Sequence, residues 1–394
     1  MLRTVRVSVA IICFSLISLL FLDFTGTLHV WFGWLAKIQF LPALLALNVG
    51  VILSLLLLTL LFGRIYCSVI CPLGVFQDII AWFGKRGKKL PYTYSRALSW
   101  LRYGILIVFI IAVLAGVGSF VALLAPYSSY GRIVSNLFAP LYQLGNNMFA
   151  YLAERAESYA FYEVDVWVKS LSTFIIALIT FGVLVLLAWR NGRTYCNTIC
   201  PVGTFLGTIA KYSLFKPVID VSKCNSCGLC ARHCKAACID SKKHKIDYSR
   251  CVVCLDCLDK CRHGAIKYMR RSAVKDKISS PVVTQDQIDS ARRNFLSVSA
   301  LFAATTVIKA QEKKVDGGLA VIEDKKIPNR VVALTPPGSL SVRNFAKHCT
   351  ACQLCVSVCP NQVLRPSGSL MTLMQPEMSY ERGYCRPECT KCSE

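Results

Sequence analysis

Residues 63–74 read GRIYCSVICPLG, and the pattern returns at residues 192–203 as GRTYCNTICPVG. Each copy follows an uncharged apolar run and carries two cysteines in a C-x-x-x-C spacing, followed by proline. That spacing places both sulfurs on one face if the turn stays helical, and proline suits the first turn of a new helix. The four thiols form a candidate cofactor site that could bind a cluster or another metal, cycle between thiol and disulfide, or simply pack at a helix end. They are Cys67, Cys71, Cys196 and Cys200.

Long apolar runs surround the repeat throughout residues 1–210. A run of about 18 uncharged residues is long enough to cross a bilayer as a helix. Three runs qualify and a fourth, near the N-terminus, is slightly shorter: 38–63, 103–131, 170–189 and 7–22. We therefore predict an α-helical membrane bundle of four transmembrane helices. The repeat indicates two parallel hairpins, with both cysteine pairs at one face.

Composition also favours a membrane protein. Of 394 residues, 54% are hydrophobic and 17% are charged, and the mean hydropathy is +0.49. These values exclude a disordered chain and an ordinary soluble enzyme. The net charge of +23 is typical of nucleic-acid-binding proteins, but in membrane proteins the positive-inside rule is the commoner cause. We therefore expect no nucleic-acid partner.

Charge also predicts the orientation in the plasma membrane. Arg3 and Arg6 precede the first apolar run, and residues 85–102 contain six Lys or Arg and no acid. By the positive-inside rule, both ends of the bundle and the cysteine pairs then face the cytoplasm. A signal peptide is the alternative interpretation of the first run, although no small-residue cleavage site follows it.

Two cysteine groups in residues 215–272 share the spacing C-x2-C-x2-C-x3-C. In bacterial ferredoxins three closely spaced thiolates bind one cluster, and the fourth cysteine binds the other. We predict an α+β ferredoxin-like 2[4Fe-4S] domain in the cytoplasm. One cluster is assigned to Cys224, Cys227, Cys230 and Cys261, and the other to Cys251, Cys254, Cys257 and Cys234. Zinc also binds four thiolates and is the alternative, but the doubled spacing favours iron–sulfur.

Two details of this unit depart from the usual pattern. Lys235 and Arg262 stand where proline usually follows the fourth cysteine. Cations close to a cluster favour its reduced state, so we expect potentials above those of low-potential ferredoxins. Cys238 is a spare thiol that we interpret as a small packing residue.

A polar linker, residues 273–291, leads to a second candidate signal at residues 292–310. Here Arg292 and Arg293 precede Phe295, Leu296 and a modest apolar stretch, which resembles a twin-arginine signal. Such a signal exports folded domains, and further cysteine motifs follow it. We therefore expect export, and an amphipathic cytoplasmic helix between two ferredoxin units is the alternative.

After a linker at 311–340, residues 341–394 begin a second ferredoxin unit, which we place in the periplasm. Cys349, Cys352, Cys355 and Cys359 form the full bacterial motif, followed by Cys385, Cys389 and Cys392. A next cysteine at the same spacing would fall beyond Glu394. If Cys359 completes the cluster of the last three cysteines, the first three lack a fourth ligand. We therefore expect a truncated chain that in full binds two more clusters; a three-iron cluster or an external ligand is the alternative.

Paired C-x-x-x-C-P motifs after membrane helices, followed by a two-cluster ferredoxin, resemble the NapH-type membrane ferredoxins. These are quinol-dehydrogenase components associated with periplasmic nitrate reductase, and the resemblance covers about residues 1–270. From about residue 290 the chain resembles the NapG type, the exported polyferredoxin partner, so it looks like a fusion of both. The resemblance implies electron flow from the membrane quinol pool to a periplasmic reductase or other redox subunits, with the four C-x-x-x-C cysteines as an inner-face redox motif.

Other classes share parts of this pattern. Cytochrome-oxidase accessory proteins of the CcoG type, which serve metallocentre assembly, combine membrane helices, C-x-x-x-C-P motifs and a ferredoxin, and the nitrous-oxide-reductase regulator type is a further relative. Neither needs a second ferredoxin unit behind an export signal. A redox sensor without turnover is the third alternative. Because no nucleophile–base pair and no spaced histidine pair is evident, we expect an electron-transfer subunit rather than a stand-alone enzyme.

Overall fold

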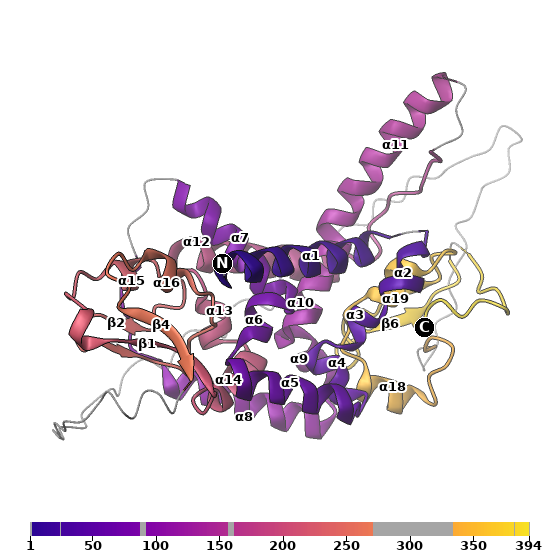
Figure 1. Ribbon diagram of the computed structural model, residues 1–394. Coiled ribbons are helices and arrows are strands. Elements are labelled where there is room, and N and C mark those ends of the chain that lie inside the picture. The colour runs from indigo at the N-terminus through magenta and orange to yellow at the C-terminus, as the bar shows by residue number, and fades with distance from the viewer. Residues whose placement is uncertain are drawn as a thin grey trace, which may run out of the picture.

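The computed structural model describes residues 2–23, 25–86, 92–156, 161–270, 334–381 and 383–393. The candidate twin-arginine segment, the linker before it and most of the linker after it lie outside these ranges. The N-terminal region is helical (Figure 1). Its helices are α1 (Leu2–Leu22), α2 (Thr27–Phe32), α3 (Trp34–Lys37), α4 (Phe40–Leu45), α5 (Val49–Phe62), α6 (Ile65–Val69), α7 (Pro72–Arg86), α8 (Ser99–Ala115), α9 (Gly118–Leu124), α10 (Pro126–Ile133), the π-helix η1 (Val134–Phe138), α11 (Ala139–Arg155), α12 (Leu171–Asn191), α13 (Thr194–Thr198) and α14 (Pro201–Ala210).

The two copies of the repeated sequence fold alike. In each, an apolar helix (α5 or α12) ends at a glycine with positive φ, a short helix (α6 or α13) carries the first cysteine, and a new helix begins at the proline. Cys71 and Cys200 fall in the break before α7 and α14, so the C-x-x-x-C turn does not stay helical. Helix α7 packs on α12 and α14 packs on α5, which interlocks the two copies crosswise.

Two of the four predicted membrane-spanning runs form single long helices within the described ranges. By length and composition, α1 and α12, of 21 residues each, are able to cross a membrane. The prediction of one unbroken helix was wrong for the two middle runs. Run 38–63 is split where Leu47 adopts a positive φ and Asn48 caps α5. Run 103–131 is split at Gly116 (φ +74°) and again before Pro126, since a residue that precedes proline disfavours the helical region.

The two cysteine-rich units are small and mix strands with short helices. In the first, β1 (Phe215–Ile219) pairs antiparallel with β4 (Ile266–Arg270), with Phe215 opposite Arg270. Between them lie the 3-10 turn η2 (Val221–Lys223), α15 (Leu229–Arg232), the pair β2 (Ile239–Asp240) and β3 (Lys245–Ile246), and α16 (Asp256–Lys260). The second contains α18 (Val342–His348), α19 (Leu354–Val358) and the antiparallel pair β5 (Leu364–Pro366) and β6 (Pro376–Met378).

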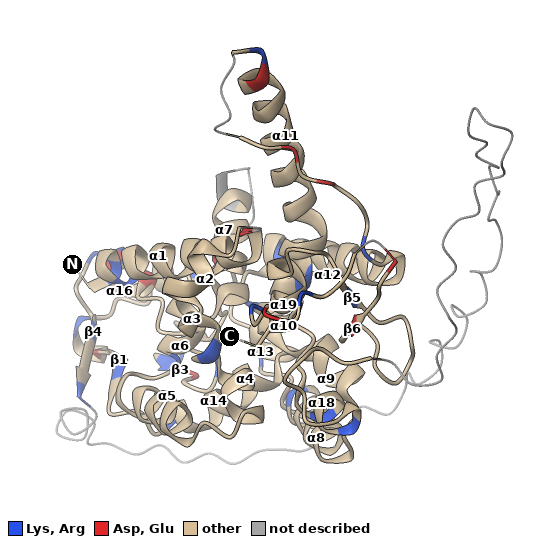
Figure 2. Cartoon of the chain, turned by 90° about the vertical axis from the view of Figure 1, so that its right-hand side faces the viewer, with Lys and Arg blue, Asp and Glu red and all other residues tan. Residues whose placement is uncertain are grey.

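The two units lie at opposite ends of the helical region, as Figure 1 shows. Helix α1 connects them: at its start Arg3 forms an ion pair with Asp256 of the first unit (2.8 Å). Just after its end, the Thr25 carbonyl accepts a hydrogen bond from Lys391 of the second unit (3.1 Å). A helix of 21 residues is about 30 Å long. In Figure 2 most of the helical ribbon is uncharged, whereas basic and acidic positions adjoin at the tip of the projecting helix α11.

Candidate metal centres

Two cavities in the first unit are lined by cysteines. The first is lined by Cys224, Cys227, Cys230 and Cys261. The second is lined by Cys234, Cys251, Cys254 and Cys257 and by the spare thiol Cys238. In both cavities the fourth cysteine of one motif joins the first three of the other, the grouping that the spacing predicts. Their role as cluster ligands remains a prediction.

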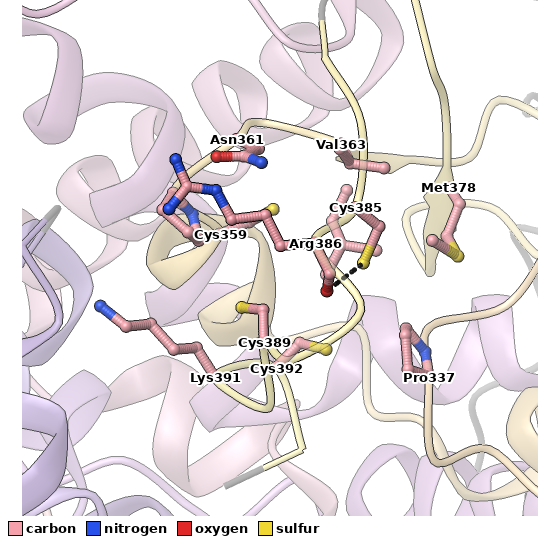
Figure 3. A pocket seen from close by; sticks show the side chains of 12 residues that line it. Pro337, Cys359, Asn361, Val363, Met378, Cys385, Arg386, Cys389, Lys391 and Cys392 are labelled. Carbon is pink, nitrogen blue, oxygen red and sulfur yellow. Dashed lines mark hydrogen bonds between the residues drawn. The ribbon is translucent and has the colours of Figure 1, made fainter.

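The second unit holds a third cavity of this kind. Figure 3 shows the side chains of Cys359, Cys385, Cys389 and Cys392 around it. The other three cysteines of the unit, Cys349, Cys352 and Cys355, do not line this cavity. Cys352 instead packs against the core of the helical region. The structure thus brings Cys359 to the last three cysteines, which is the condition under which the first three lack a fourth ligand.

The three C-x2-C-x2-C-x3-C loops also share one backbone path. In each, the residues before and after the second cysteine have positive φ, and so does the third residue after the fourth cysteine. The positions are Ser226, Gly228 and Ala237; Val253, Leu255 and Gly264; and Ala351, Gln353 and Gln362. A positive φ is unfavourable for a β-branched residue such as Val253 and costs about 1–3 kcal/mol. The same strained path in three loops fits chains that wrap around a bound group.

Each cavity is lined by four thiols of the cysteine motifs, which is the donor set that a [4Fe-4S] cluster takes. Zinc also binds four thiolates, so the spacing of the motifs, rather than the cavities, favours iron–sulfur. Burial raises the pKa of Cys254 to about 12, so a metal that binds there has to displace a proton.

Cys238 has a position that the sequence analysis did not predict. Its sulfur lies 3.5 Å from the Cys234 sulfur, and it is 1% exposed. Cys238 therefore contacts a predicted cluster ligand, Cys234, rather than packing in a core apart from the cysteine motifs. The Cys234-x-x-x-Cys238 spacing was the available signal, but it does not distinguish a fifth thiol beside a cluster from a packing residue.

The four cysteines of the repeated motif gather in the centre of the helical region. Each is 3–4% exposed. Cys67, Cys71 and Cys200 belong to one buried core, and Arg64 contacts both the Cys67 sulfur and the Cys196 carbonyl. We refer to these four side chains as the four-thiol centre. Cys67 and Cys71, which lie more than 150 positions before Cys224, thus join Cys196 and Cys200, because the two copies of the repeat interlock.

Two buried arginines cross between the copies around the four-thiol centre. Arg64 donates to the Cys196 carbonyl (3.1 Å), and Arg193 donates to the Cys67 carbonyl (2.6 Å). Each arginine precedes the first cysteine of its own copy and binds the backbone of the other. Both are 0% exposed. The Gly-Arg pair of each repeat was visible in the sequence, but this exchanged pairing depends on the fold.

Gly74 and Gly203 leave room for the hydrogen bonds that Arg193 and Arg64 donate across the two copies of the repeat. We predict that Gly74→Ala disrupts this arrangement. A Cβ on Gly74 would overlap the Cys67 carbonyl and approach Arg193 Nη1 to 2.7 Å. Overpacking of this kind costs about 1–3 kcal/mol, so the thermal midpoint in detergent should fall. Gly182→Ala in α12 is the control, because a Cβ there meets nothing within 4 Å. Equal midpoints for both variants would contradict the close packing.

Lys235 is not the free cation that the sequence analysis assumed. Its Nζ lies 3.2 Å from Asp256 and 3.5 Å from Asp78. Burial alone would lower the pKa of Lys235, but the two carboxylates raise it, so the lysine stays charged and its charge is offset. The expectation of a raised cluster potential stays a prediction, with the charge of Lys235 paired to two carboxylates. Arg262 is not paired in this way in any described ion pair.

Comparison with known proteins adds to this geometry. The family described as "4Fe-4S binding domain" matches residues 44–91 and 173–221, so each match contains one copy of the repeat. The pyruvate synthase subunit PorD of Methanothermobacter marburgensis is 39% identical over 70 residues, which are 18% of this chain and 85% of PorD. The chain is a ferredoxin-type 4Fe-4S protein.

Longer matches relate this ferredoxin-type protein to a further ferredoxin-type protein and to a putative electron transport protein. The ferredoxin-type protein NapH of Haemophilus influenzae is 28% identical over 241 residues, 59% of this chain and 70% of NapH. The protein YccM of Escherichia coli is 24% identical over 229 residues, 56% of this chain, and the chain spans about half (55%) of YccM. No solved structure matches.

Proposed function

We propose that this ferredoxin-type protein passes electrons from membrane quinol, through [4Fe-4S] clusters in two units, to a periplasmic reductase. The observation that carries the proposal is the set of three cavities, each lined by at least four cysteines of the ferredoxin motifs. The proposed ligand sets are Cys224, Cys227, Cys230 and Cys261; Cys234, Cys251, Cys254 and Cys257; and Cys359, Cys385, Cys389 and Cys392. Cys349, Cys352 and Cys355 begin a fourth set.

We further propose that the helical region spans the plasma membrane four times, with the first unit in the cytoplasm and the second in the periplasm. Helices α1 and α12 have the length for this, whereas α5 and α8 are apolar but shorter, at 14 and 17 residues. The position of the units at opposite ends of α1 supports the sidedness, since its roughly 30 Å equals the hydrocarbon thickness. Export through residues 292–310 and the NapG-like character of the second unit belong to the same proposal.

The chain's own residues would hold and tune the clusters. Bound [4Fe-4S] clusters would supply one-electron redox chemistry at each cavity. The thiolates bind them, the strained loops enclose them, and the ion pair of Lys235 with Asp256 sets the local charge near the second cavity. Quinol releases two electrons and two protons, so each quinol requires two successive single-electron transfers.

A candidate quinol site lies beside the second unit. A cavity of about 400 Å³ is enclosed by the end of α1, by η1 and the start of α11, by α12 and by Ser357 of the second unit. Its walls are largely apolar, with a few polar groups such as Asn136, Gln143 and Lys169. Ser135 Oγ is buried there without a hydrogen-bond partner among the described residues. A cavity of this size, apolar with a few polar groups, suits a lipophilic ligand with a polar head.

The decisive experiment adds a reduced menaquinone analogue to the anaerobic protein in detergent and follows the clusters by EPR. We expect reduction on the turnover timescale. Ala139→Trp, which fills the cavity, should slow quinol reduction at least about tenfold, a change of about 1.4 kcal/mol. Reduction by dithionite should not change. Leu144→Trp, on the exposed side of α11, is the matched control.

Two outcomes would contradict the proposal at different levels. Equal rates of cluster reduction by quinol in Ala139→Trp and Leu144→Trp would show that quinol does not bind in this cavity. Clusters that reduce with dithionite but never with quinol would overturn the quinol-linked function. The second result would favour the alternative of a metallocentre assembly factor.

A further inference from the structure

A large cavity lies where the helical region meets the first ferredoxin unit, and we refer to it as the junction cavity. Its volume is about 990 Å³, and none of the described residues that line it is a cysteine. Its walls come from residues 92–98 before α8, from residues between 189 and 198 in α12 and α13, and from residues 235–237 and Arg250 of the first unit. Figure 1 shows α13 beside the first unit. A cavity of this volume is large enough for a small molecule or a lipid headgroup.

The lining of the junction cavity is positively charged. Four of the described lining residues are Lys or Arg, and none is Asp or Glu. Lys235 and Arg250 pair with carboxylates that lie outside the lining. Arg96 and Arg190 are exposed and form no ion pair within the part of the chain that the structure describes. The cavity therefore carries two cationic groups whose charge is not offset by a paired carboxylate.

Arg250 adds a buried group whose hydrogen bonds are incomplete. It is 4% exposed, its Nε donates to Asp247 (2.8 Å), and its Nη1 donates to Ser95 Oγ (3.3 Å). Its Nη2 is buried without a hydrogen-bond partner among the described residues. A buried donor is costly to leave unpaired, and a guanidinium binds two oxygens of a phosphate side by side. A phosphate in the cavity would complete the hydrogen bonds of this arginine.

The number and type of donors favour phosphate over carboxylate. The three arginines of the lining come from three separate segments, and Thr93, Thr194 and Thr198 add hydroxyl groups that can donate. A carboxylate has only two oxygens, whereas a phosphate group offers at least three strong acceptors. The lining therefore suits a phosphate that accepts hydrogen bonds from several directions.

The position of the cavity relative to α12 suggests where such a phosphate comes from. Trp189 and Arg190 lie in the last turn of this apolar helix, and Trp189 is 46% exposed. Tryptophan at the end of an apolar helix is typical of a membrane interface. In the proposed topology this end faces the cytoplasm, where basic pockets between helices bind anionic phospholipid headgroups. A soluble phosphate compound is the other source of the same chemistry.

The walls of the junction cavity are bonded to the loop that carries Cys234. Ser95 donates its N–H to the Ala237 carbonyl (3.3 Å), and the N–H of Arg193, just before α13, donates to the Lys235 carbonyl (2.9 Å). A ligand in the cavity is thus held against residues that directly follow a predicted cluster ligand. Since local charge is one determinant of a cluster's potential, an anion at this place makes the cluster harder to reduce.

We propose that the junction cavity binds the phosphate group of an anionic ligand through Arg96, Arg190 and Arg250, and that the bound anion lowers the midpoint potential of the neighbouring cluster. Binding changes no covalent bond and moves no electron. The binding part is independent of electron transfer. The redox part rests on the proposed function, because it requires a [4Fe-4S] cluster held by Cys234 and the thiols that share its cavity.

The first test measures binding to the full chain in detergent, after removal of co-purified lipid. The probes are phosphatidylglycerol, inorganic phosphate and, as a lipid without net charge, phosphatidylcholine. Arg96→Gln/Arg190→Gln should weaken binding of the anionic probe at least about tenfold, because it removes two charged donors. Lys211→Gln/Arg262→Gln is the matched control. It removes the same charge at exposed positions outside the cavity lining and should bind like the wild type.

The probes also identify the source of the phosphate. Saturable binding of phosphatidylglycerol but not of inorganic phosphate would identify a phospholipid headgroup, and binding of inorganic phosphate would identify a soluble ligand. Failure of both anionic probes to bind would overturn the proposal, and so would equal affinities of the two double variants or of the two lipids. Because Arg96 and Arg190 are exposed and unpaired in the described ion pairs, the ligand-free double variant should keep the wild-type thermal midpoint.

The second test follows the clusters of the first unit in a redox titration monitored by EPR. Saturation with the anionic probe should shift one midpoint potential to a more negative value in the wild type, and Arg96→Gln/Arg190→Gln should show no shift. By linkage, reduction of the protein should weaken binding by the matching factor. An unchanged wild-type potential at saturation would overturn the redox part. Absence of clusters from the first unit would instead overturn the proposed function and leave the binding result in place.

Discussion

Asp78→Asn should destabilise the protein by about 3–5 kcal/mol, the cost of leaving a buried charge without its partner. Asp78 binds Arg193 through both carboxylate oxygens, at 2.9 and 2.7 Å, and also lies near Arg6 (3.4 Å) and Lys235 (3.5 Å). Arg193 is fully buried, so water cannot replace the lost carboxylate. Because Arg193 anchors both the Cys67 backbone and the Lys235 loop, the loss should loosen the four-thiol centre and the first unit together.

The measurement is the thermal midpoint of the purified protein in detergent. A loss of this size should lower it by roughly 4–6 °C. Asp259→Asn is the matched control, because Asp259 is half exposed and lies 3.7 Å from Arg3. Exposed pairs contribute about 0–1 kcal/mol. Similar midpoints for the two variants would show that the Asp78 network does not stabilise the fold.

The same residue predicts a pH dependence. Burial alone would raise the pKa of Asp78, but the charges of Arg193 and Lys235 hold it well below its ordinary value. A carboxylate with a depressed pKa contributes its full stability above its unfolded pKa of about 3.9, and that contribution is lost as the pH falls towards the native pKa. The gap between the midpoints of wild type and Asp78→Asn should therefore stay constant from about pH 5 to 8. A gap that closes within that range would contradict the assigned charge state.

The sequence predicts those features that depend on local spacing. The C-x2-C-x2-C-x3-C rhythm predicted that Cys261 lies with Cys224 and that Cys234 lies with Cys254, and the structure places them so. The repeat predicted equivalent local folds, and Pro72 and Pro201 begin helices as expected. Apolar length was less informative: a run of uncharged residues does not reveal that Leu47 or Gly116 will take a left-handed conformation and end a helix.

Features that depend on tertiary pairing could not be predicted. Asp78 meets partners 72 and 115 positions away, and no periodicity links them. Arg6 illustrates the consequence. The sequence analysis used it only as a charge that orients the first helix, whereas its side chain is 7% exposed and pairs with Asp78. Polar residues in an apolar region serve either topology or packing, and only the positions of their partners separate the two roles.

Cys227→Ala should remove the cluster of the first cavity and leave the other clusters in place. Cys227 is the exposed member of its set, so its loss opens the cluster to solvent without creating a cavity in the core. Three remaining thiolates hold at most a damaged cluster, so the iron content should fall by about one to four atoms per chain, with loss of one [4Fe-4S] EPR signal. Metal analysis and EPR of the dithionite-reduced protein provide the measurement.

Cys238→Ala is the control that makes this result specific. Cys238 lies 3.5 Å from Cys234 but is the fifth thiol of a cavity that already has four in motif positions. The Cys238→Ala variant should therefore keep the iron content of the wild type. Loss of iron in this variant would show that Cys238 replaces Cys234 as a ligand. Zinc in place of iron in the wild type, with one atom lost in Cys227→Ala, would overturn the iron–sulfur assignment. The pair of variants thus tests both the identity of the metal and the crossed assignment of the fourth ligands, on which electron transfer through the first unit depends.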